Sequence, residues 1–377
     1  MAVSTTQLKR KAHELGFDIV GVTPAEPAST LDAYFRWIEN GLHADMGYLA
    51  RPDRQERRKD LNIIVPNVRS IVLVGLNRYN NSVPKDVLED PSRGRIASYA
   101  WGDDYHEIVQ KRLEILADWL GEEAGYDINH KAYIDTGPVL ERAHAQQAGM
   151  GFVGKSAILI NPKWGSHFSI GEILTDLEFT TYDEPIKNTS CGYCTRCLIS
   201  CPTDAFVEPY VLNAKRCIAY QTLENKGWID RELRPLMGNR ILGCDVCQDV
   251  CPWQKYASPT KEEALYPVNY DRAAPPLLDL LAIDDAKFAE IFKGSGVFRV
   301  KRERIVRNAC VAAGNWGSAD AIPQLTMLLD DPSPLIRGHA AWALGQIMGD
   351  DARKLLTTHL DREQDEDVRN ELELILN

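Results

Sequence analysis

Hydrophobic and polar residues alternate with two different periods over the first 180 residues of the chain. Three segments with a helical period are predicted to be amphipathic helices: residues 5–17, 31–42 and 106–123. Three short apolar runs are predicted to be buried strands: residues 70–76, 131–135 and 157–161. A further helix is predicted from Pro138 to Gly149, because proline suits a first helical turn and glycine ends a helix. The pattern indicates a mixed α/β domain over residues 1–180, whose strand ends and loops can hold a flat cofactor.

The pattern changes twice after this domain. From Tyr182 to about Ala257 cysteine, proline and short turns dominate, which predicts a separate metal-organised, ferredoxin-like module over residues 181–262. A proline-containing connector over residues 263–300 follows it. The predicted fold class is therefore α+β and multidomain, ending in a helical segment over residues 301–377.

The helical segment contains an internal repeat of about 31 residues. The run ACVAAGN at Ala309 matches AAWALGQ at Ala340, and VRN at Val306 recurs at Val368. Paired helices with such a period are typical of a short HEAT-like solenoid, which builds recognition surfaces. The alternative is a stabilising helical cap that has no partner.

Charge and cysteine content narrow the class of protein. The net charge of -11 argues against broad nonspecific nucleic-acid binding but is compatible with a local basic face. Neither the first residues nor any later stretch has the apolar length of a signal sequence or membrane span, so we expect a cytoplasmic monomer without membrane contact. Eight of the nine cysteines lie between Cys191 and Cys251, which favours metal binding over disulfides.

The cysteines follow a ferredoxin pattern. The stretch CGYCTRCLISCP contains Cys191, Cys194, Cys197 and Cys201, and GCDVCQDVCP contains Cys244, Cys247 and Cys251. Three closely spaced thiolates can hold one 4Fe-4S cube, while the fourth cysteine of such a motif serves another cluster. Exchange of the last cysteines predicts two clusters: Cys191, Cys194, Cys197 and Cys251 for the first, and Cys201, Cys217, Cys244 and Cys247 for the second. Two Cys₄ zinc sites are the alternative.

A glycine-rich stretch and the ninth cysteine are weaker indications of function. Residues 149–156, GMGFVGKS, match phosphate-binding patterns, but they follow a predicted helix and lead into a strand, the reverse of the order that a phosphate loop requires. The glycines still allow close approach of a large flat group, and Lys155 is a candidate contact. Cys310 lies on an apolar helix face and is interpreted as a small hydrophobic residue.

Taken together, these motifs resemble the epoxyqueuosine reductase family. The resemblance covers essentially the whole chain: the run YIDTGPVLERAHAQQAGMGFVGKSAILINPKWGSHFSIGEILTDLEF, the two cysteine motifs with Cys217 between them, and the HEAT-like tail. It implies an enzyme with two 4Fe-4S clusters and cobalamin that reduces epoxyqueuosine in tRNA, the last step of queuosine biosynthesis. It also implies a cofactor domain shared with reductive dehalogenases.

The resemblance implies that Asp135 is the proton donor. Removal of the epoxide oxygen as water needs an acid, and a carboxyl group in that role needs a pKa raised by burial to stay protonated near neutral pH. The alternative is that Asp135 only forms a turn. Tyr105 and His106 are candidates for positioning substrate or relaying a proton, although His106 can equally be a capping or surface histidine.

The cobalamin implied by the resemblance has no histidine axial ligand that the sequence identifies. The DxHxxG motif of another cobalamin class is absent. Ser98 stands where some family members carry cysteine, so no thiol acts there. The candidate cobalamin contacts are Arg58, Ser98, Asp135, Gly151, Lys155, Asn161, Ser169 and Gln221.

The tRNA implied by the resemblance needs positive charge at its phosphates. One basic cluster consists of Arg51, Arg54, Arg57, Arg58 and Lys59. The candidate tRNA contacts at the start of the repeats are Lys301, Arg302, Arg304 and Arg307, although most charge runs are only solvated faces. An external electron donor is also implied. The alternative functions are reductive dehalogenation of a small molecule and a non-enzymatic two-cluster electron carrier.

Overall fold

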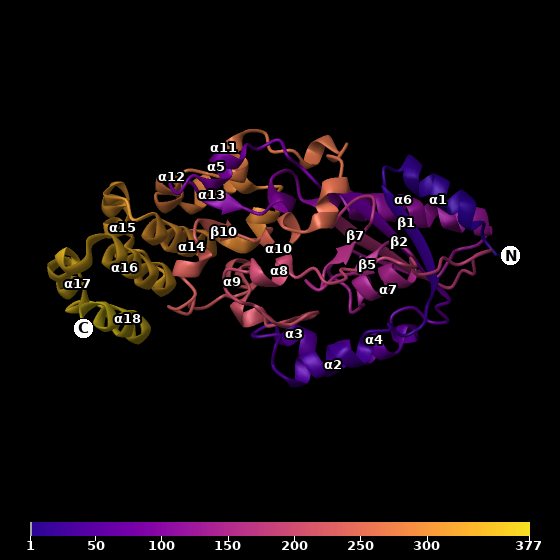
Figure 1. Ribbon diagram of the computed structural model, residues 1–377, viewed down its shortest axis with the longest axis horizontal. Helices are drawn as coiled ribbons and strands as arrows, with labels where there is room; N and C mark the ends of the chain where they lie inside the picture. The colour runs from indigo at the N-terminus through magenta and orange to yellow at the C-terminus, as the bar shows by residue number, and fades with distance from the viewer. Residues whose placement is uncertain (1) are drawn as a thin grey trace. The chain divides into compact units, whose positions relative to one another are not determined.

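The computed structural model describes residues 2–377, which form two compact units (Figure 1). Both units are discontinuous in sequence. The first contains the residues up to Tyr79 with residues 104–215 and 246–263, and the second contains residues 80–103, 216–245 and 264–377. The expected linear boundaries at residues 181 and 301 do not coincide with these units, whereas the one at residue 263 lies within one residue of an observed boundary. The reason is strand pairing: β3 (Arg95–Ile96) pairs with β10 (Arg240–Leu242), which takes part of the cysteine-rich segment into the second unit.

An antiparallel four-stranded sheet forms the centre of the first unit. Its order is β1 (Ile19–Pro24), β2 (Ser70–Asn77), β7 (Phe168–Thr175) and β4 (His130–Tyr133). Every residue of β2 and β7 is buried, which requires that both faces of the sheet are covered.

Two helices cover the opposite faces of this sheet. A Cβ atom added to Gly171 would meet Val109 and Leu113 of α6 (Tyr105–Ala124), so Gly171 faces that helix. Side chains alternate along a strand, and Ile170 and Leu174 therefore face the other side, where they share a core with α7 (Glu141–Gln147). Glu172 lies between them on the α7 face.

Most helices and strands expected from the pattern are present, with some different ends. The three long helical predictions are confirmed as α1 (Thr5–Glu14), α2 (Leu31–Glu39) and α6, and the strand at residues 70–76 is β2. The other predicted elements are shorter: β4 stops at Tyr133, α7 begins only at Glu141, and β6 is limited to Leu159–Ile160. The strands β1 and β7 were not predicted.

The remaining elements are short. In the first unit they are α3 (Gly47–Ala50), α4 (Pro52–Lys59), β5 (Phe152–Val153), α8 (Arg196–Ile199), β8 (Phe206–Glu208), β9 (Val211–Leu212) and α10 (Val246–Asp249). In the second they are α5 (Lys85–Glu89), α9 (Ile218–Leu223), α11 (Tyr270–Ala273), α12 (Leu277–Leu281) and α13 (Asp285–Phe292).

The predicted helical repeats are present in the second unit. They consist of α14 (Lys301–Trp316), α15 (Ile322–Leu328), α16 (Pro334–Met348), α17 (Arg353–Leu360) and α18 (Glu366–Leu376). The helix α14 packs against α16, and α16 packs against α18, as stacked repeats do. Cys310 is completely buried in this core, as expected for a small hydrophobic residue.

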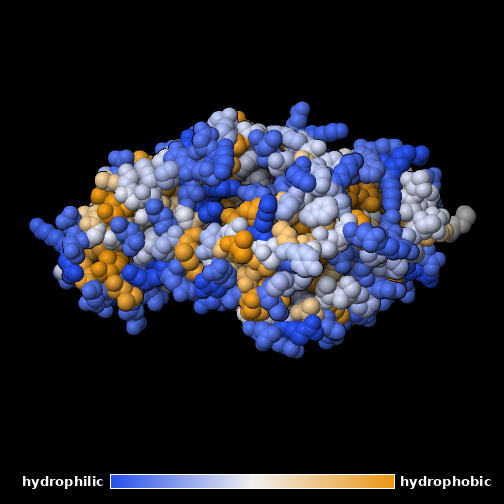
Figure 2. Space-filling view, viewed as in Figure 1, coloured by the Kyte–Doolittle hydropathy of each residue, from blue (hydrophilic) through white to orange (hydrophobic). Residues whose placement is uncertain are grey.

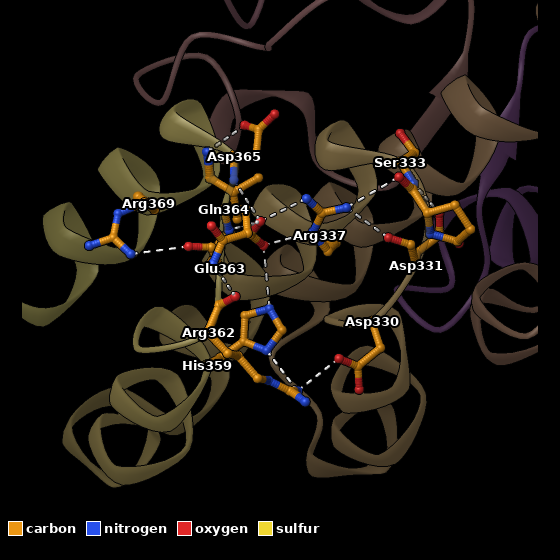
Figure 3. A network of polar contacts seen from close by, with 12 residues as sticks. Asp330, Asp331, Ser333, Arg337, His359, Arg362, Glu363, Gln364, Asp365 and Arg369 are labelled. Atoms are coloured by element: carbon orange, nitrogen blue, oxygen red, sulfur yellow. Dashed lines mark hydrogen bonds and ion pairs between the residues drawn. The ribbon is translucent and has the colours of Figure 1, made fainter.

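Ion pairs link successive repeats (Figure 3). Arg302 of α14 pairs with Asp331 at 2.9 Å, and Arg337 of α16 pairs with Glu363 at 2.7 Å. Burial alone would raise the pKa of Glu363, but the Arg337 guanidinium and the backbone N–H of Asp365 outweigh it and lower that pKa to about 2. The turn before α16, which contains Asp331, and the turn before α18, which contains Glu363, are thereby each held by an arginine from the preceding long helix.

The visible face of the molecule is mainly hydrophilic, with smaller hydrophobic patches (Figure 2). Within residues 2–377 no helix combines the length and the apolar character that a membrane span requires.

Candidate active site and cluster-binding cysteines

Asp135 lies in a tight turn two residues beyond β4. Its φ of 55° places it in the left-handed region, which non-glycine residues seldom occupy and which aspartate tolerates better than most. The turn packs closely, because a Cβ atom at Gly137 would come within 2.6 Å of the Tyr133 ring. Unusual backbone of this kind concentrates at functional sites.

Tyr105 and His106 meet Asp135 from the start of α6. The Tyr105 hydroxyl donates a hydrogen bond to Oδ2 of Asp135, and Nε2 of His106 lies 3.9 Å from the same oxygen. The Asp104 carboxylate caps α6 by accepting from the backbone N–H of His106, and it lies 2.7 Å from Nδ1 of the same residue. The structure therefore brings together the three residues that the sequence proposed for proton transfer.

Two further carboxyl groups, which the sequence reasoning missed, lie beside Asp135. The backbone N–H of Asp135 donates to Oε1 of Glu141 at 3.0 Å, and the two side chains also hydrogen-bond to each other. Glu172 is completely buried, and neither of its carboxyl oxygens has a hydrogen-bond partner within the described residues. A charged residue inside the apolar run FSIGEILT was the signal that could have identified Glu172.

Burial governs the protonation of this carboxyl cluster. Burial, helped by the nearby Asp135 carboxylate and opposed by Arg58, raises the pKa of Glu172 to about 8. Burial, followed by the charges of Glu172 and Asp135, raises the pKa of Glu141 well above its ordinary value. Contrary to the sequence expectation, the acids with a raised pKa are therefore the completely buried Glu172 and the partly buried Glu141, whereas the side chain of Asp135 is 49% exposed.

Basic residues from α4 border the turn. A guanidinium nitrogen of Arg54 donates to the carbonyl oxygen of Thr136 at 3.2 Å. Arg58 is buried, its guanidinium lies 4.9 Å from the centre of the Tyr34 ring, and its Nε has no hydrogen-bond partner in the part of the chain that is described. Positive charge thus reaches the Asp135 turn from a segment far away in sequence.

Several candidate cobalamin contacts already have structural roles. A Cβ atom at Gly151 would lie 2.4 Å from the Ile160 carbonyl oxygen, so this glycine serves strand packing. The amide of Asn161 donates to the Met150 carbonyl oxygen, and its oxygen accepts from two backbone N–H groups of its own turn. Ser169 is buried on β7. Ser98 and Gln221 belong to the second unit, where both are buried.

Other buried donors have no partner among the described residues. They include the hydroxyl of Ser166 and Nε2 of Gln254, two residues joined by a hydrogen bond between the Ser166 N–H and the Gln254 oxygen. A buried polar group without a partner is costly, so such donors indicate a ligand or water rich in hydrogen-bond acceptors. The sequence reasoning did not identify either residue.

The four cysteines predicted to hold the first cluster line one cavity. Cys191, Cys194, Cys197 and Cys251 border a space of about 270 Å³, which Cys247 also reaches. Burial raises the pKa of the Cys197 and Cys251 thiols, and the neighbouring Cys191 raises both further. The backbone N–H of Lys155 donates to Sγ of Cys191 at 3.4 Å. Convergent sulfurs with a backbone donor suit an iron-sulfur cluster.

The other four cysteines lie near the ends of short elements. Cys217 is the N-cap of α9, Cys244 follows β10 by two residues, and Cys201 and Cys247 belong to the first unit. The GMGFVGKS segment follows α7, contains β5 and leads to β6, which confirms the order of helix before strand that argues against a phosphate loop. The ammonium group of Lys155 in that segment donates to the Gly192 carbonyl oxygen at 2.8 Å.

The basic run at the start of α14 is only partly exposed. Lys301 is exposed, whereas Arg302 pairs with Asp331 and Arg304 donates to the Leu223 carbonyl oxygen. Arg307 has no exposed surface and its guanidinium donates to backbone carbonyl oxygens. The expectation that Arg307 contacts tRNA is therefore wrong, because a charge buried in this way cannot reach a phosphate group.

Three family models match the chain. Residues 58–136 match "Epoxyqueuosine reductase QueG, DUF1730", residues 190–254 match "4Fe-4S double cluster binding domain", and residues 301–377 match "HEAT repeats". The second match favours clusters over the alternative zinc sites. The chain is 36% identical to epoxyqueuosine reductase of Escherichia coli over 341 residues, covering 90% of this chain and 88% of that protein. It is 38% identical to the Bacillus subtilis enzyme over 382 residues, covering 97% and 94%.

Solved structures give the same result. A crystal structure of epoxyqueuosine reductase with an epoxyqueuosine-modified tRNA-Tyr stem loop matches with a TM-score of 0.89 and 34% identity, covering 98% of this chain and 97% of that chain. A Bacillus subtilis structure, whose catalytic aspartate loop is swung out of the active site, matches with a TM-score of 0.87. This chain belongs to the epoxyqueuosine reductase family of iron-sulfur oxidoreductases.

Proposed function

We propose that this protein reduces epoxyqueuosine in tRNA to queuosine, with Asp135 as the proton donor and cobalamin as a cofactor. The observation that carries this proposal is the position of Asp135, in a left-handed turn where the Tyr105 hydroxyl and the Glu141 carboxyl group both contact it. The Bacillus subtilis relative supports this assignment, because its catalytic aspartate also lies on a loop.

The reaction balances with the groups that surround Asp135. Conversion of an epoxide to an alkene breaks two C–O bonds and consumes two electrons and two protons, and the oxygen leaves as water. The Asp135 carboxyl group donates one proton to the departing oxygen. Tyr105 orients that carboxyl group through its hydrogen bond, while His106, oriented by Asp104, lies 3.9 Å from Oδ2 and is the candidate source of a replacement proton.

The chain also offers contacts for the cofactors. The buried donors of Arg58, Ser166 and Gln254 that lack partners within the described residues suit the amide and phosphate oxygens of cobalamin. When bound, the two clusters supply electrons singly and cobalamin supplies the two-electron reductant for the organic substrate. We assign Cys191, Cys194, Cys197 and Cys251 to the first cluster, and Cys201, Cys217, Cys244 and Cys247 to the second.

The partners are a tRNA and an electron donor. Arg54 and its neighbours on α4 lie beside the Asp135 turn and provide positive charge for the phosphates around an inserted nucleotide. Lys301 on the first helical repeat is a second candidate contact, because it is exposed. The electrons come from an external reductant.

Reconstitution tests the proposed function. We expect protein reconstituted without oxygen to hold about eight irons and one cobalamin per chain, and to convert epoxyqueuosine in a tRNA stem loop to queuosine. The measurements are iron and cobalt content and mass spectrometry of the digested RNA. Eight irons with neither cobalamin nor turnover would contradict the proposal and indicate an electron carrier. Turnover of a halogenated aromatic but not of the tRNA would indicate a dehalogenase.

The buried Glu172 predicts an unusual dependence of stability on pH. Its pKa is about 8 in the folded protein and ordinary in the unfolded chain, so the folded state holds the extra proton. Stability is therefore lost as pH rises from the ordinary carboxyl range to about 8 and levels off above it. A Glu172→Gln variant cannot ionise, and we expect its advantage in stability over the wild type to be about 4 kcal/mol larger at pH 9 than at pH 5.

Thermal unfolding followed by circular dichroism at both pH values measures this difference. The matched control is Glu122→Gln at an exposed position of α6, which we expect to leave the pH dependence unchanged. A Glu172→Gln variant that is less stable than the wild type at pH 9 would show that the buried carboxylate is stabilised in the folded protein.

A further inference from the structure

Arg307 is buried and not available to tRNA, which indicates a different role for the first helical repeat. Its guanidinium donates three hydrogen bonds to carbonyl oxygens of the α9 region: Gln221 at 2.6 Å, Asn225 at 2.9 Å and Gly227 at 2.6 Å. The same guanidinium also bonds to the side-chain oxygen of Asn308. Burial lowers the pKa of Arg307 to about 9, which leaves it charged at neutral pH.

Two further residues of α14 contact the same region. The Asn308 amide donates to the Thr222 carbonyl oxygen at 3.1 Å and to the Ile241 carbonyl oxygen at 2.8 Å. Arg304 donates to the Leu223 carbonyl oxygen. The last carbonyl groups of α9 have no partner within their own helix, so α14 supplies the cap, and its positive charge suits the negative end of the helix dipole.

These contacts tie down two segments that carry cysteines. Cys217 caps the other end of α9, and Ile241 on β10 precedes Cys244 by three residues. A further hydrogen bond joins the α9 and β10 segments directly: the backbone N–H of Gly243 donates to the Thr222 hydroxyl at 2.9 Å. The helices α9 and α14 and the strand β10 are mutual neighbours within the second unit.

We propose that Arg307 and Asn308 are positioning residues for the second 4Fe-4S cluster, holding Cys217 and Cys244 at the separation that the cluster requires. The inference rests on the assignment of these two cysteines to one cluster. The first helical repeat then has a structural role in electron transfer, whatever else the repeats bind. Arg302 of the same basic run instead bonds to Asp331 and to the Ile283 carbonyl oxygen.

Iron content and electron paramagnetic resonance of the reduced full-length protein test the proposal without tRNA or cobalamin. We expect reconstituted wild type to hold about eight irons and Arg307→Ala to hold about four, with the signal of the second cluster lost and that of the first retained. Circular dichroism should remain that of a folded chain. The matched control, Arg302→Ala on the same helix, should keep all eight irons.

A second variant covers the case in which Arg307→Ala does not fold. Asn308→Ala leaves the Arg307 bonds to the α9 region in place but removes the bonds to Thr222 and Ile241 and those that Asn308 accepts from Arg307, and we expect it to lower the iron content toward four. The proposal is overturned if Asn308→Ala, or a folded Arg307→Ala, holds eight irons with unchanged signals. It is also overturned if Arg302→Ala loses as much iron as Arg307→Ala, or if wild type holds only four irons. Iron content and the resonance signals do not depend on turnover. Failure of the proposed tRNA activity would therefore not change the outcome of this test.

Discussion

An Asp135→Asn variant should bind both clusters and cobalamin as the wild type does, yet reduce epoxyqueuosine about 10²–10⁴-fold more slowly. Asparagine has the same shape and can still accept the hydrogen bond of Tyr105, but it has no acidic proton to give to the departing oxygen. Single-turnover assays on an epoxyqueuosine-containing stem loop, with iron and cobalt quantified on the same sample, measure this loss.

The control for this variant is Asp118→Asn, at an exposed position of α6, which should retain the wild-type rate. If Asp135→Asn turned over at the wild-type rate with a full complement of cofactors, the proton would have to come from another group. His106 would then be the next candidate, since it lies 3.9 Å from the same carboxylate oxygen.

The second large effect concerns the cysteines. Cys197→Ser and Cys201→Ser should each reduce the iron content from about eight to about four and abolish turnover, because each removes a ligand from a different cluster. The double variants distinguish the ligand sets. Cys197→Ser with Cys251→Ser should lose only the first cluster and retain about four irons, whereas Cys197→Ser with Cys201→Ser should lose both.

The ninth cysteine provides the control. Cys310 is buried in the core of the helical repeats, so Cys310→Ala should retain all the iron and full turnover. Equal iron loss in the two double variants would contradict the assignment of Cys201 and Cys251 to different clusters. Iron analysis and the absorption spectrum of the anaerobic protein are the measurements.

Local patterns predicted much of the fold. The helices α1, α2 and α6 and the strand β2 follow directly from periodicity: α1 and α6 bury one face, β2 buries both faces, and α2 has the helical period although none of its residues is fully buried. The strand β7 was missed because glycine and glutamate interrupt its apolar run, although it pairs with both β2 and β4. Tertiary pairing supplies the backbone hydrogen bonds that make it the centre of the sheet.

The candidate site was predicted less completely. The Asp135, Tyr105 and His106 positions came from the resemblance, and the structure brings them together. Glu141 and Glu172 were missed, since no periodicity indicates that two acids from α7 and β7 lie beside Asp135. The sequence reasoning also expected Asp135 to be buried, whereas its side chain, on the turn after β4, is half exposed.

The sequence by itself determined the iron-sulfur cluster motifs and the repeats. Cluster ligands act at fixed short spacings within one loop, and a helical repeat is written as a period, so both features are local and readable from the chain. Only the tertiary structure showed that Arg307 is buried. A basic residue in a charged run is normally solvated, and only the packing of α14 against α9 shows that its charge is buried among backbone carbonyl groups. Burial depends on contacts between segments far apart in sequence, which no local pattern records.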